Sequence, residues 1–293
     1  MSILIDKSSR VLIQGITGST GRIYAERMKR DGTPLVGGVT PGRGGQEVAG
    51  VPVFDTMAEA VAATGADCVL SAVRPSLALD AVYEAVSSGI RLMVLYSENV
   101  PVHDAMKMCA FARAKGVQLL GPNSAGVISP GKANMADISL ERTRPGRIGI
   151  VSKSGTLTYE AMDTLHAAGL GTSSIVCLGG DPVVGTEFAE VLRLFDADPD
   201  TDAVVLIGEP GGGMEFRAAE AVREMGKPVV AYLTGRNAPA EKRMGHAGAV
   251  SSASGDTSAA AKAQVLEDAG ARIAPRVTQI GAVVAGLLGV GAA

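Results

Sequence analysis

The sequence predicts an α/β protein made of two doubly wound domains. Short β-branched runs alternate with amphipathic stretches along the chain, one segment near the middle interrupts this alternation, and 293 residues exceed what one hydrophobic core usually organises. With 46% hydrophobic residues, 38 glycines and a formal charge of −3, the composition is typical of a compact enzyme. The mild acidity and the absence of tryptophan argue against a nucleic-acid partner.

The first half predicts a parallel sheet with helices between its strands. β-branched runs predict strands at 11–14, 34–39, 68–73, 92–96 and 117–121. Amphipathic periodicity predicts helices near 20–31, 56–64, 77–89 and 102–115. We therefore expect a first domain over residues 1–122.

The alternation stops between residues 122 and 146, where three prolines and several turn-forming residues show no sustained period. We place a linker at 123–146 and a second α/β domain at 147–293. Its predicted strands are 147–152, 173–179, 203–208, 228–234 and 271–275. Its predicted helices are 155–168, 186–197, 214–225, 258–269 and 277–288.

The stretch QGITGSTGR, residues 14–22, follows the first strand and opens the first helix. Gly15, Gly18 and Gly21 let the backbone turn tightly, and the start of the helix offers N–H groups to a phosphate. A glycine pattern alone also fits a tight turn, but its place in a βαβ unit favours a ligand that carries phosphate.

The second strand runs into VTPGRGG instead of the acidic residue that binds the ribose of NAD. Arg43 in this loop suits an additional phosphate, such as the 3′-phosphate of coenzyme A or the 2′-phosphate of NADP. A solvated arginine is the alternative interpretation. Plain NAD is disfavoured.

The stretch VSKSGTLTYE begins a second strand–helix junction. Ser154 and Gly155 open a helix whose first N–H groups point at one position, which favours an anion. An ordinary serine N-cap has the same pattern.

One of three histidines, His246, lies in RMGHAGA among glycine and alanine, which leaves its ring accessible. Glu209 follows a predicted strand in LIGEPGGG, at the sheet edge where parallel sheets collect ligands. A carboxylate there would hold one ring nitrogen as N–H and leave the other as a nucleophile, although the sequence does not show that the two meet. A solvated Glu209 is the alternative.

Other features predict little chemistry. Cys68, Cys109 and Cys177 have no metal-binding spacing and read as buried thiols, and no pair of histidines has the spacing of metal ligands. The N-terminus does not resemble a signal peptide, and no apolar run reaches the length of about 20 residues that spans a bilayer. We therefore expect a cytoplasmic protein with no metal site and no membrane partner.

Seven segments, in this order, resemble the α subunit of succinyl-CoA synthetase and its relatives, including malate–CoA ligase: GITGSTG, GGVTPGRGG, GPNSAGVISPG, VSKSGTLTYE, GGDPVVGTEF, IGEPGG and KRMGHAGA. The resemblance covers essentially the whole chain. It implies a Rossmann-like domain that binds coenzyme A, followed by a flavodoxin-like domain that carries a phosphohistidine. It also implies a β subunit with an ATP-grasp fold, in an αβ or (αβ)₂ assembly, which supplies most of the site for ATP or GTP with Mg²⁺.

The same resemblance implies roles for particular residues. His246 would be phosphorylated, Glu209 would orient its ring, and Ser154 with Gly155 would bind the phosphoryl group. Tyr159 would lie near the subunit boundary and the acid. The coenzyme A residues would be Thr17, Gly18, Ser19, Thr20, Arg43, Tyr96, Ser97 and Glu98.

The activity implied is that of an NDP-forming acid–CoA ligase. An NADP-dependent oxidoreductase and a coenzyme A or acyl-CoA binding protein without catalysis remain alternatives. The chain departs from the family at the expected acid-binding end, because PNSAG replaces Pro-Asn-Cys-Pro-Gly and brings in Ser124. The expected PGHI-type element is missing from 131–146, and EPGGG replaces Glu-Ile-Gly-Gly. The identity of the small acid is therefore open, and a hydroxyl at Ser124 would suit a polar one.

Overall fold

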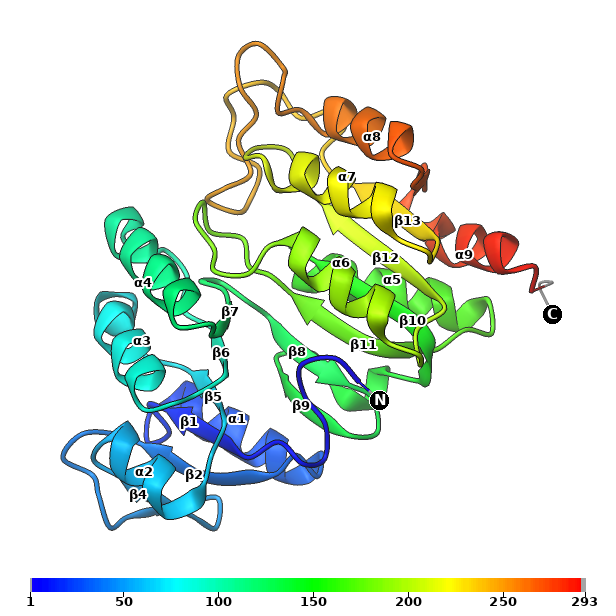
Figure 1. Ribbon diagram of the computed structural model, residues 1–293. Helices are drawn as coiled ribbons and strands as arrows, with labels where there is room; N and C mark the ends of the chain where they lie inside the picture. The colour runs from blue at the N-terminus through cyan, green and yellow to red at the C-terminus, as the bar shows by residue number, and fades with distance from the viewer. Residues whose placement is uncertain (1, 291–293) are drawn as a thin grey trace.

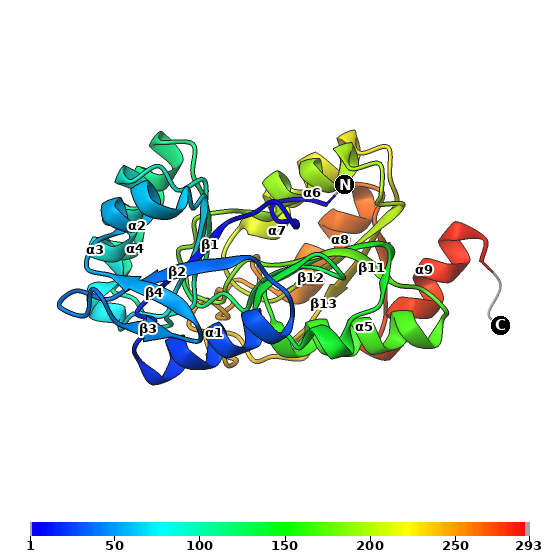
Figure 2. The ribbon, with the colours of Figure 1, turned by 90° about the horizontal axis from the view of Figure 1, so that it is seen from below.

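The computed structural model describes residues 2–290, which form two sheets with helices on both faces (Figures 1 and 2). In the view of Figure 2, α2–α4 and α6–α7 lie on one side of the strands, whereas α1 and α5 lie on the other. One apolar core cluster contains residues of both sheets, such as Val11 and Ile13 of the first and Val151 and Val176 of the second. The two sheets therefore share a continuous core.

The first sheet has the strand order β3-β4-β2-β1-β5-β6-β7, and only β3 runs antiparallel. Counted along the chain, its parallel strands are ordered 3-2-1-4-5-6, the order of dinucleotide-binding domains. The Rossmann-like prediction is confirmed. The strands are β1 (Val11–Gln14), β2 (Leu35–Val39), β3 (Glu47–Val48), β4 (Val51–Phe54), β5 (Cys68–Ser71), β6 (Leu92–Leu95) and β7 (Gln118–Leu120). The helices are α1 (Ser19–Arg30), α2 (Met57–Thr64), α3 (Ala78–Ser87) and α4 (Val102–Ala114).

The second sheet has the order β14-β13-β12-β10-β11-β8-β9. Its parallel strands follow the order 2-1-3-4-5, which confirms the flavodoxin-like prediction. The strands are β8 (Gly126–Ser129), β9 (Ala133–Ala136), β10 (Pro145–Ser152), β11 (Thr172–Cys177), β12 (Ala203–Gly208), β13 (Val229–Leu233) and β14 (Arg272–Ile273). The helices are α5 (Gly155–Ala167), α6 (Phe188–Ala197), α7 (Met214–Glu224), α8 (Ala259–Asp268) and α9 (Ile280–Leu288).

Four strands were not predicted from the sequence. β3 and β4 form a short hairpin at the edge of the first sheet, and β8 and β9 form another within 123–146. The second hairpin joins the second sheet because β8 pairs antiparallel with β11. Its strands are four residues each and are rich in small side chains, so they show no clear alternation. The domain boundaries themselves stay a prediction.

Helix ends follow the local sequence. Thr56 and Glu59 form a reciprocal capping box at the start of α2. Ser154 and Ser258 cap α5 and α8 by accepting the N–H groups of Leu157 and Ala261. Between residues 2 and 290 there is no helix whose length and apolar character would let it cross a membrane.

Candidate active site

The two glycine-rich segments lie where each sheet reverses its strand order. In the first sheet β1 lies between β2 and β5, and in the second sheet β10 lies between β11 and β12. Open parallel sheets bind ligands beyond the carboxyl ends of the strands at such reversal points. The loop after β1 and the segments after β10 and β12 therefore occupy the positions at which the topology builds sites.

The loop after β1 is shaped by its glycines. Gly15 has a φ of +78°, in the left-handed region that favours glycine. A Cβ on Gly21 would overlap the Gly15 carbonyl oxygen, so only glycine lets α1 pack this closely on the loop. Gly18 is the N-cap of α1, and no side chain in the described part of the chain, residues 2–290, caps the helix. The first N–H groups of α1 thus remain available to an anion.

A cleft of about 840 Å³ opens beside this loop. Four predicted residues line it, namely Thr17, Gly18, Ser19 and Thr20. The opposite wall comes from the ends of β2 and β5 and from the start of α3, with Val39, Val73, Leu77 and Ala81 as apolar members. An elongated ligand with both phosphate and apolar parts fits such a lining.

Arg43 lies in the exposed turn at the rim of this cleft and does not line it. The Asp55 carboxylate accepts the N–H groups of Arg43 at 2.9 Å and of Gly44 at 2.8 Å. The turn is thereby fixed next to Thr40 and Pro41, which do line the cleft. Within residues 2–290 the guanidinium of Arg43 has no hydrogen-bonding or ionic partner.

The segment Tyr96–Glu98 follows β6 and also lies outside the cleft lining. It is joined to the cleft wall, because the Ser97 hydroxyl donates to the carbonyl of Val73, which lines the cleft. The Tyr96 N–H donates to the carbonyl of Ser71 at the end of β5. Tyr96 and Glu98 are exposed, whereas Ser97 is buried. The structure brings this segment to the same end of the sheet as the first loop.

His246 and Glu209 meet. The His246 Nδ1 and the Glu209 Oε2 lie 2.7 Å apart, although 37 residues separate them in the chain. A carboxylate only accepts hydrogen bonds, so Nδ1 carries the proton and Nε2 has the free lone pair. Glu209 is buried, and the imidazole is 29% exposed.

The environment raises the pKa of His246 above its ordinary value of 6.5. The largest cause is the hydrogen bond to Glu209, and burial of the ring opposes it. Lys153 lowers the pKa and Asp181 raises it, both through their charges.

Glycines surround the imidazole. A Cβ on Gly180 would overlap the His246 ring, so the ring packs directly on this backbone. Gly248 N–H donates to the Gly180 carbonyl at 3.1 Å, and Ala249 N–H donates to the His246 carbonyl at 3.1 Å. These contacts hold residues 243–249, the histidine loop, against the segment that follows β11, near the top of the molecule in Figure 1.

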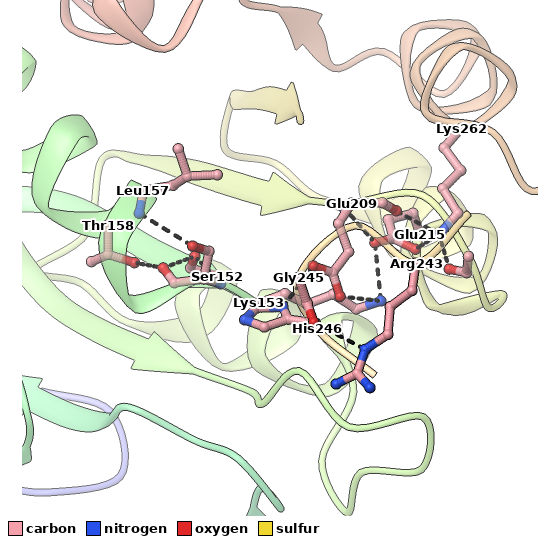
Figure 3. Close-up of polar contacts among 12 residues, drawn as sticks. Ser152, Lys153, Leu157, Thr158, Glu209, Glu215, Arg243, Gly245, His246 and Lys262 are labelled. Atoms are coloured by element: carbon pink, nitrogen blue, oxygen red, sulfur yellow. Dashed lines mark hydrogen bonds and ion pairs between the residues drawn. The ribbon is translucent and has the colours of Figure 1, made fainter. Parts of the chain in front are cut away.

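Three buried charged residues that sequence reasoning missed extend the His246–Glu209 pair (Figure 3). Lys153 Nζ lies 3.9 Å from Glu209 Oε1 and 3.3 Å from Glu215 Oε1, and Lys262 Nζ lies 2.5 Å from Glu215 Oε2. One signal was present: Lys262 falls on the face of α8 that also buries Ala259 and Leu266. A lysine on an apolar face indicates a buried partner.

Ser154 and Gly155 lie where β10 passes into α5. The Ser154 hydroxyl accepts the Leu157 N–H at 3.2 Å, so it caps the helix as the sequence allowed. The N–H groups of Gly155 and Thr156 precede the first intrahelical bonds and have no intrahelical acceptor. Ser152 at the end of β10 pairs with Ile207 of β12. The start of α5 and Glu209 therefore lie next to each other, just beyond the ends of these two strands.

Ser124 and Tyr159 face the protein's own backbone. The buried Ser124 hydroxyl donates to the Cys177 carbonyl at 2.6 Å and accepts the Gly126 N–H at 2.9 Å. The Tyr159 hydroxyl accepts the Ser139 N–H at 2.9 Å. Ser124 therefore has no hydroxyl hydrogen left for a substrate in this conformation.

The cysteines agree with the sequence interpretation. Cys68, Cys109 and Cys177 are buried and unpaired, and burial raises the pKa of each thiol to about 12. In residues 2–290 no three His, Cys, Asp or Glu side chains gather in a way that would hold a metal ion.

Comparison with known proteins places the chain among the CoA-ligase proteins. A family model described as CoA binding domain matches residues 6–99, and one described as CoA-ligase matches residues 151–272. The chain belongs to the family of α subunits of ADP-forming acid–CoA ligases, and it is the α subunit of an NDP-forming acid–CoA ligase that uses coenzyme A.

Three relatives illustrate the match. The succinate–CoA ligase [ADP-forming] subunit alpha 2 of Archaeoglobus fulgidus is 48% identical, over 98% of this chain and 100% of its own length. The malate–CoA ligase subunit alpha of Methylorubrum extorquens is 44% identical over 98% of this chain and 99% of its own length. An ADP-forming sulfoacetate–CoA ligase subunit of Bilophila wadsworthia is 41% identical over 99% of this chain and 100% of its own length.

A solved structure shares the fold. ATP citrate lyase from Methanothrix soehngenii, in complex with citrate and coenzyme A, superposes with a TM-score of 0.85 at 24% identity. The match covers 99% of this chain and 52% of that one, so this chain spans about half of the larger protein.

Proposed function

We propose that His246 carries the phosphoryl group between a nucleoside triphosphate and a small carboxylic acid. The observation that carries the proposal is the 2.7 Å contact between His246 Nδ1 and Glu209, which leaves Nε2 as the nucleophile. Nε2 attacks the terminal phosphorus and the nucleoside diphosphate leaves. A carboxylate oxygen of the acid then attacks the same phosphorus, and the imidazole leaves.

The last step makes the thioester. The sulfur of the coenzyme A thiol attacks the carbonyl carbon of the acyl phosphate, the bond from that carbon to the phosphate oxygen breaks, and the thiol proton ends on the inorganic phosphate that leaves. A free carboxylate is a poor electrophile, whereas an acyl phosphate has a leaving group that a thiolate can expel. The protein contributes mainly by positioning and by stabilising charge.

We assign the chain's residues to these steps. Glu209 holds the imidazole with Nε2 free and stabilises positive charge on the ring when the N–P bond forms. Ser154 and Gly155 at the start of α5 supply N–H groups and helix dipole for the phosphoryl oxygens. The same side-by-side arrangement at the ends of β10 and β12 supports both assignments.

We assign coenzyme A to the 840 Å³ cleft. The backbone at Thr17–Thr20 would bind its pyrophosphate, and Arg43 at the rim would bind the ribose phosphate. Tyr96, Ser97 and Glu98 would contact the part of the molecule that leads toward His246. The start of α1, which has no side-chain cap within residues 2–290, and the guanidinium of Arg43, which has no partner there, both suit phosphate groups.

The nucleotide belongs to a partner. The relatives are named as alpha subunits, which implies a β subunit. We infer that this β subunit has an ATP-grasp fold and binds ATP or GTP with Mg²⁺. The Mg²⁺ ion would neutralise phosphate charge. The expected assembly is αβ or (αβ)₂. Location in the cytoplasm is likewise a proposal.

The acid is a small carboxylate or dicarboxylate, since the relatives act on succinate, malate and sulfoacetate. Tyr159 and Ser124 are the proposed contacts on this chain. Because the Ser124 hydroxyl hydrogen is donated to Cys177, Ser124 would serve the acid by shaping the backbone after Pro122 rather than by donating directly.

The test uses the complex with the β subunit. The complex is incubated with γ-labelled ATP or GTP and Mg²⁺, and label on this chain is compared between the wild type and His246→Asn. We expect an acid-labile, base-stable label in the wild type only. Discharge by a panel of acids together with coenzyme A then identifies the substrate.

The same experiment has a contradicting outcome. A folded complex that binds coenzyme A but takes up no label from either nucleotide would favour the coenzyme A binding protein without catalysis. Label that persists in His246→Asn would place the phosphoryl group elsewhere.

A further inference from the structure

Lys262 lies on α8, outside every segment that pointed to the site, and is fully buried. Its ammonium group has three hydrogens, and the structure gives it three acceptors. They are the Glu209 carbonyl at 2.8 Å, the Gly211 carbonyl, and Glu215 Oε2 at 2.5 Å. Two of these acceptors belong to the loop that carries Glu209.

Glu215, on the first turn of α7, is equally buried and binds the same loop from the other side. Its Oε1 accepts the Glu209 N–H at 3.2 Å and lies 3.3 Å from Lys153 Nζ. The peptide groups on both sides of Glu209 are therefore fixed, the N–H by Glu215 and the carbonyl by Lys262. Figure 3 shows Lys262, Glu215 and Glu209 in contact on one side of His246.

The loop needs such restraint. Gly211 and Gly212 have φ values of +87° and +61°, and glycine loses more conformational freedom on ordering than any other residue. Burying several charges is costly, and apolar residues of similar size often stabilise a protein as well. Stability alone thus gives no reason for this pair to be charged.

We propose that Lys262 and Glu215 are positioning residues that fix the backbone of Glu209 and thereby aim its carboxylate at His246 Nδ1. The proposal rests on the proposed function in one respect: the orientation of Glu209 matters for activity because His246 is the proposed nucleophile. Neither residue touches the imidazole, so each acts through Glu209.

The direction in which the pKa of His246 changes when Lys262 is replaced distinguishes a positioning role from a purely electrostatic one. Glu209, Lys153 and Asp181 carry the charges that act most strongly on the imidazole. Removing the cation of Lys262 while Glu209 stays in place would raise the pKa of His246 or leave it unchanged. Displacing Glu209 removes the main cause of the raised pKa, so the pKa would fall.

The experiment is an NMR titration of ¹³C-labelled histidine in the full chain, for wild type, Lys262→Met and the double variant Glu215→Gln/Lys262→Met. We expect the pKa of His246 to fall toward about 6.5 in both variants. The double variant removes the charges of Lys262 and Glu215 together, and Lys153 keeps Glu209 as its ionic partner. It therefore carries the test if the single variant does not fold.

Lys227→Met is the matched control. Lys227 also binds two backbone carbonyls, those of Phe195 and Asp198, but it lies away from the histidine. We expect this variant to lose thermal stability and to leave the His246 titration unchanged. A far-UV circular dichroism spectrum confirms that each variant is folded.

Two outcomes overturn the proposal. An unchanged or raised pKa of His246 in the folded variants would show that Glu209 stays aimed without Lys262. A fall in Lys262→Met that the double variant reverses would show that Glu209 is displaced by the unpaired charge of Glu215 and not by the loss of the hydrogen bonds from Lys262. The titration needs neither nucleotide nor β subunit, so absence of phosphorylation in the wild type would refute the proposed function without affecting this result.

Discussion

At the scale of single residues, the contact between His246 and Glu209 predicts a specific pH dependence. Phosphorylation needs the Nε2 lone pair, so the rate should fall as pH drops through the raised pKa of His246, which lies above 6.5. Glu209→Gln removes the main cause of the shift, so the pKa should fall. The exposed His103 provides an internal NMR signal that should be the same in both proteins.

The raised pKa of His246 also makes the folding stability depend on pH, and the direction of the shift determines the direction of this dependence. The folded pKa of His246 is raised, so the folded chain binds the proton more tightly than the unfolded chain does. The resulting stabilisation is complete below the unfolded value of about 6.5 and is lost as pH rises through the folded pKa. Denaturant titrations at several pH values should show this loss in the wild type and a smaller one in Glu209→Gln. Equal slopes in both proteins would contradict the assignment.

At the scale of elements, the fit between α1 and the loop after β1 makes Gly21 indispensable to the cleft. A Cβ at Gly21 would overlap the Gly15 carbonyl, and backbone must move to relieve it. We expect Gly21→Ala to weaken coenzyme A binding by about tenfold or more, or about 1.4 kcal/mol, measured by calorimetry.

Gly286→Ala is the control for this prediction. Gly286 lies within α9 and is exposed, and among residues 2–290 an added Cβ would meet no atom within 4 Å beyond its own helix. This substitution should leave coenzyme A binding unchanged and stabilise the helix by up to about 1 kcal/mol. Unchanged affinity in Gly21→Ala would show that the loop does not depend on this close packing.

At the scale of the whole molecule, one buried carboxylate joins the two sites. Asp181, in the segment that packs on His246, accepts the N–H groups of Asn99 at 3.4 Å and Val100 at 3.2 Å. These two residues directly follow Tyr96–Glu98. Gly180 N–H also donates to Asn123, whose own N–H donates to the Ser97 carbonyl. The proposed coenzyme A segment and the histidine loop are therefore connected through hydrogen bonds.

Asp181→Ala removes the acceptor of the N–H groups of Asn99, which is exposed, and of Val100, which is buried. Leaving the buried N–H group unsatisfied costs about 1–3 kcal/mol. We expect a lower thermal midpoint and a higher Kd for coenzyme A. Asp268→Ala is the control, because Asp268 is exposed and its carboxylate accepts a hydrogen bond from Gln264 of its own helix, its one side-chain contact within residues 2–290. If both variants melt alike, the contact at Asp181 does not hold the two parts together.

Most of the fold and part of the site follow from the sequence. The strand–loop–helix segments at Gly15–Gly21 and Ser152–Gly155 are local, so short patterns predict them. The contact between His246 and Glu209 depends on β12 lying beside β10 and on a long loop folding back, which no local pattern encodes. The charged group of Lys153, Glu215 and Lys262 comes from three separate elements, and the hairpin of β8 and β9 gains its place by pairing with β11. Long-range contacts of this kind become visible only in the folded structure.

In the proposed mechanism, Glu209 holds Nδ1 of His246 so that Nε2 accepts the phosphoryl group. The most direct measurement is NMR of the phosphorylated complex, with ³¹P and with ¹⁵N-labelled histidine, which identifies the nitrogen that carries phosphorus. We expect phosphorus on Nε2 of His246, with the Nδ1 proton retained. Phosphorus on Nδ1, or on another residue, would contradict the account.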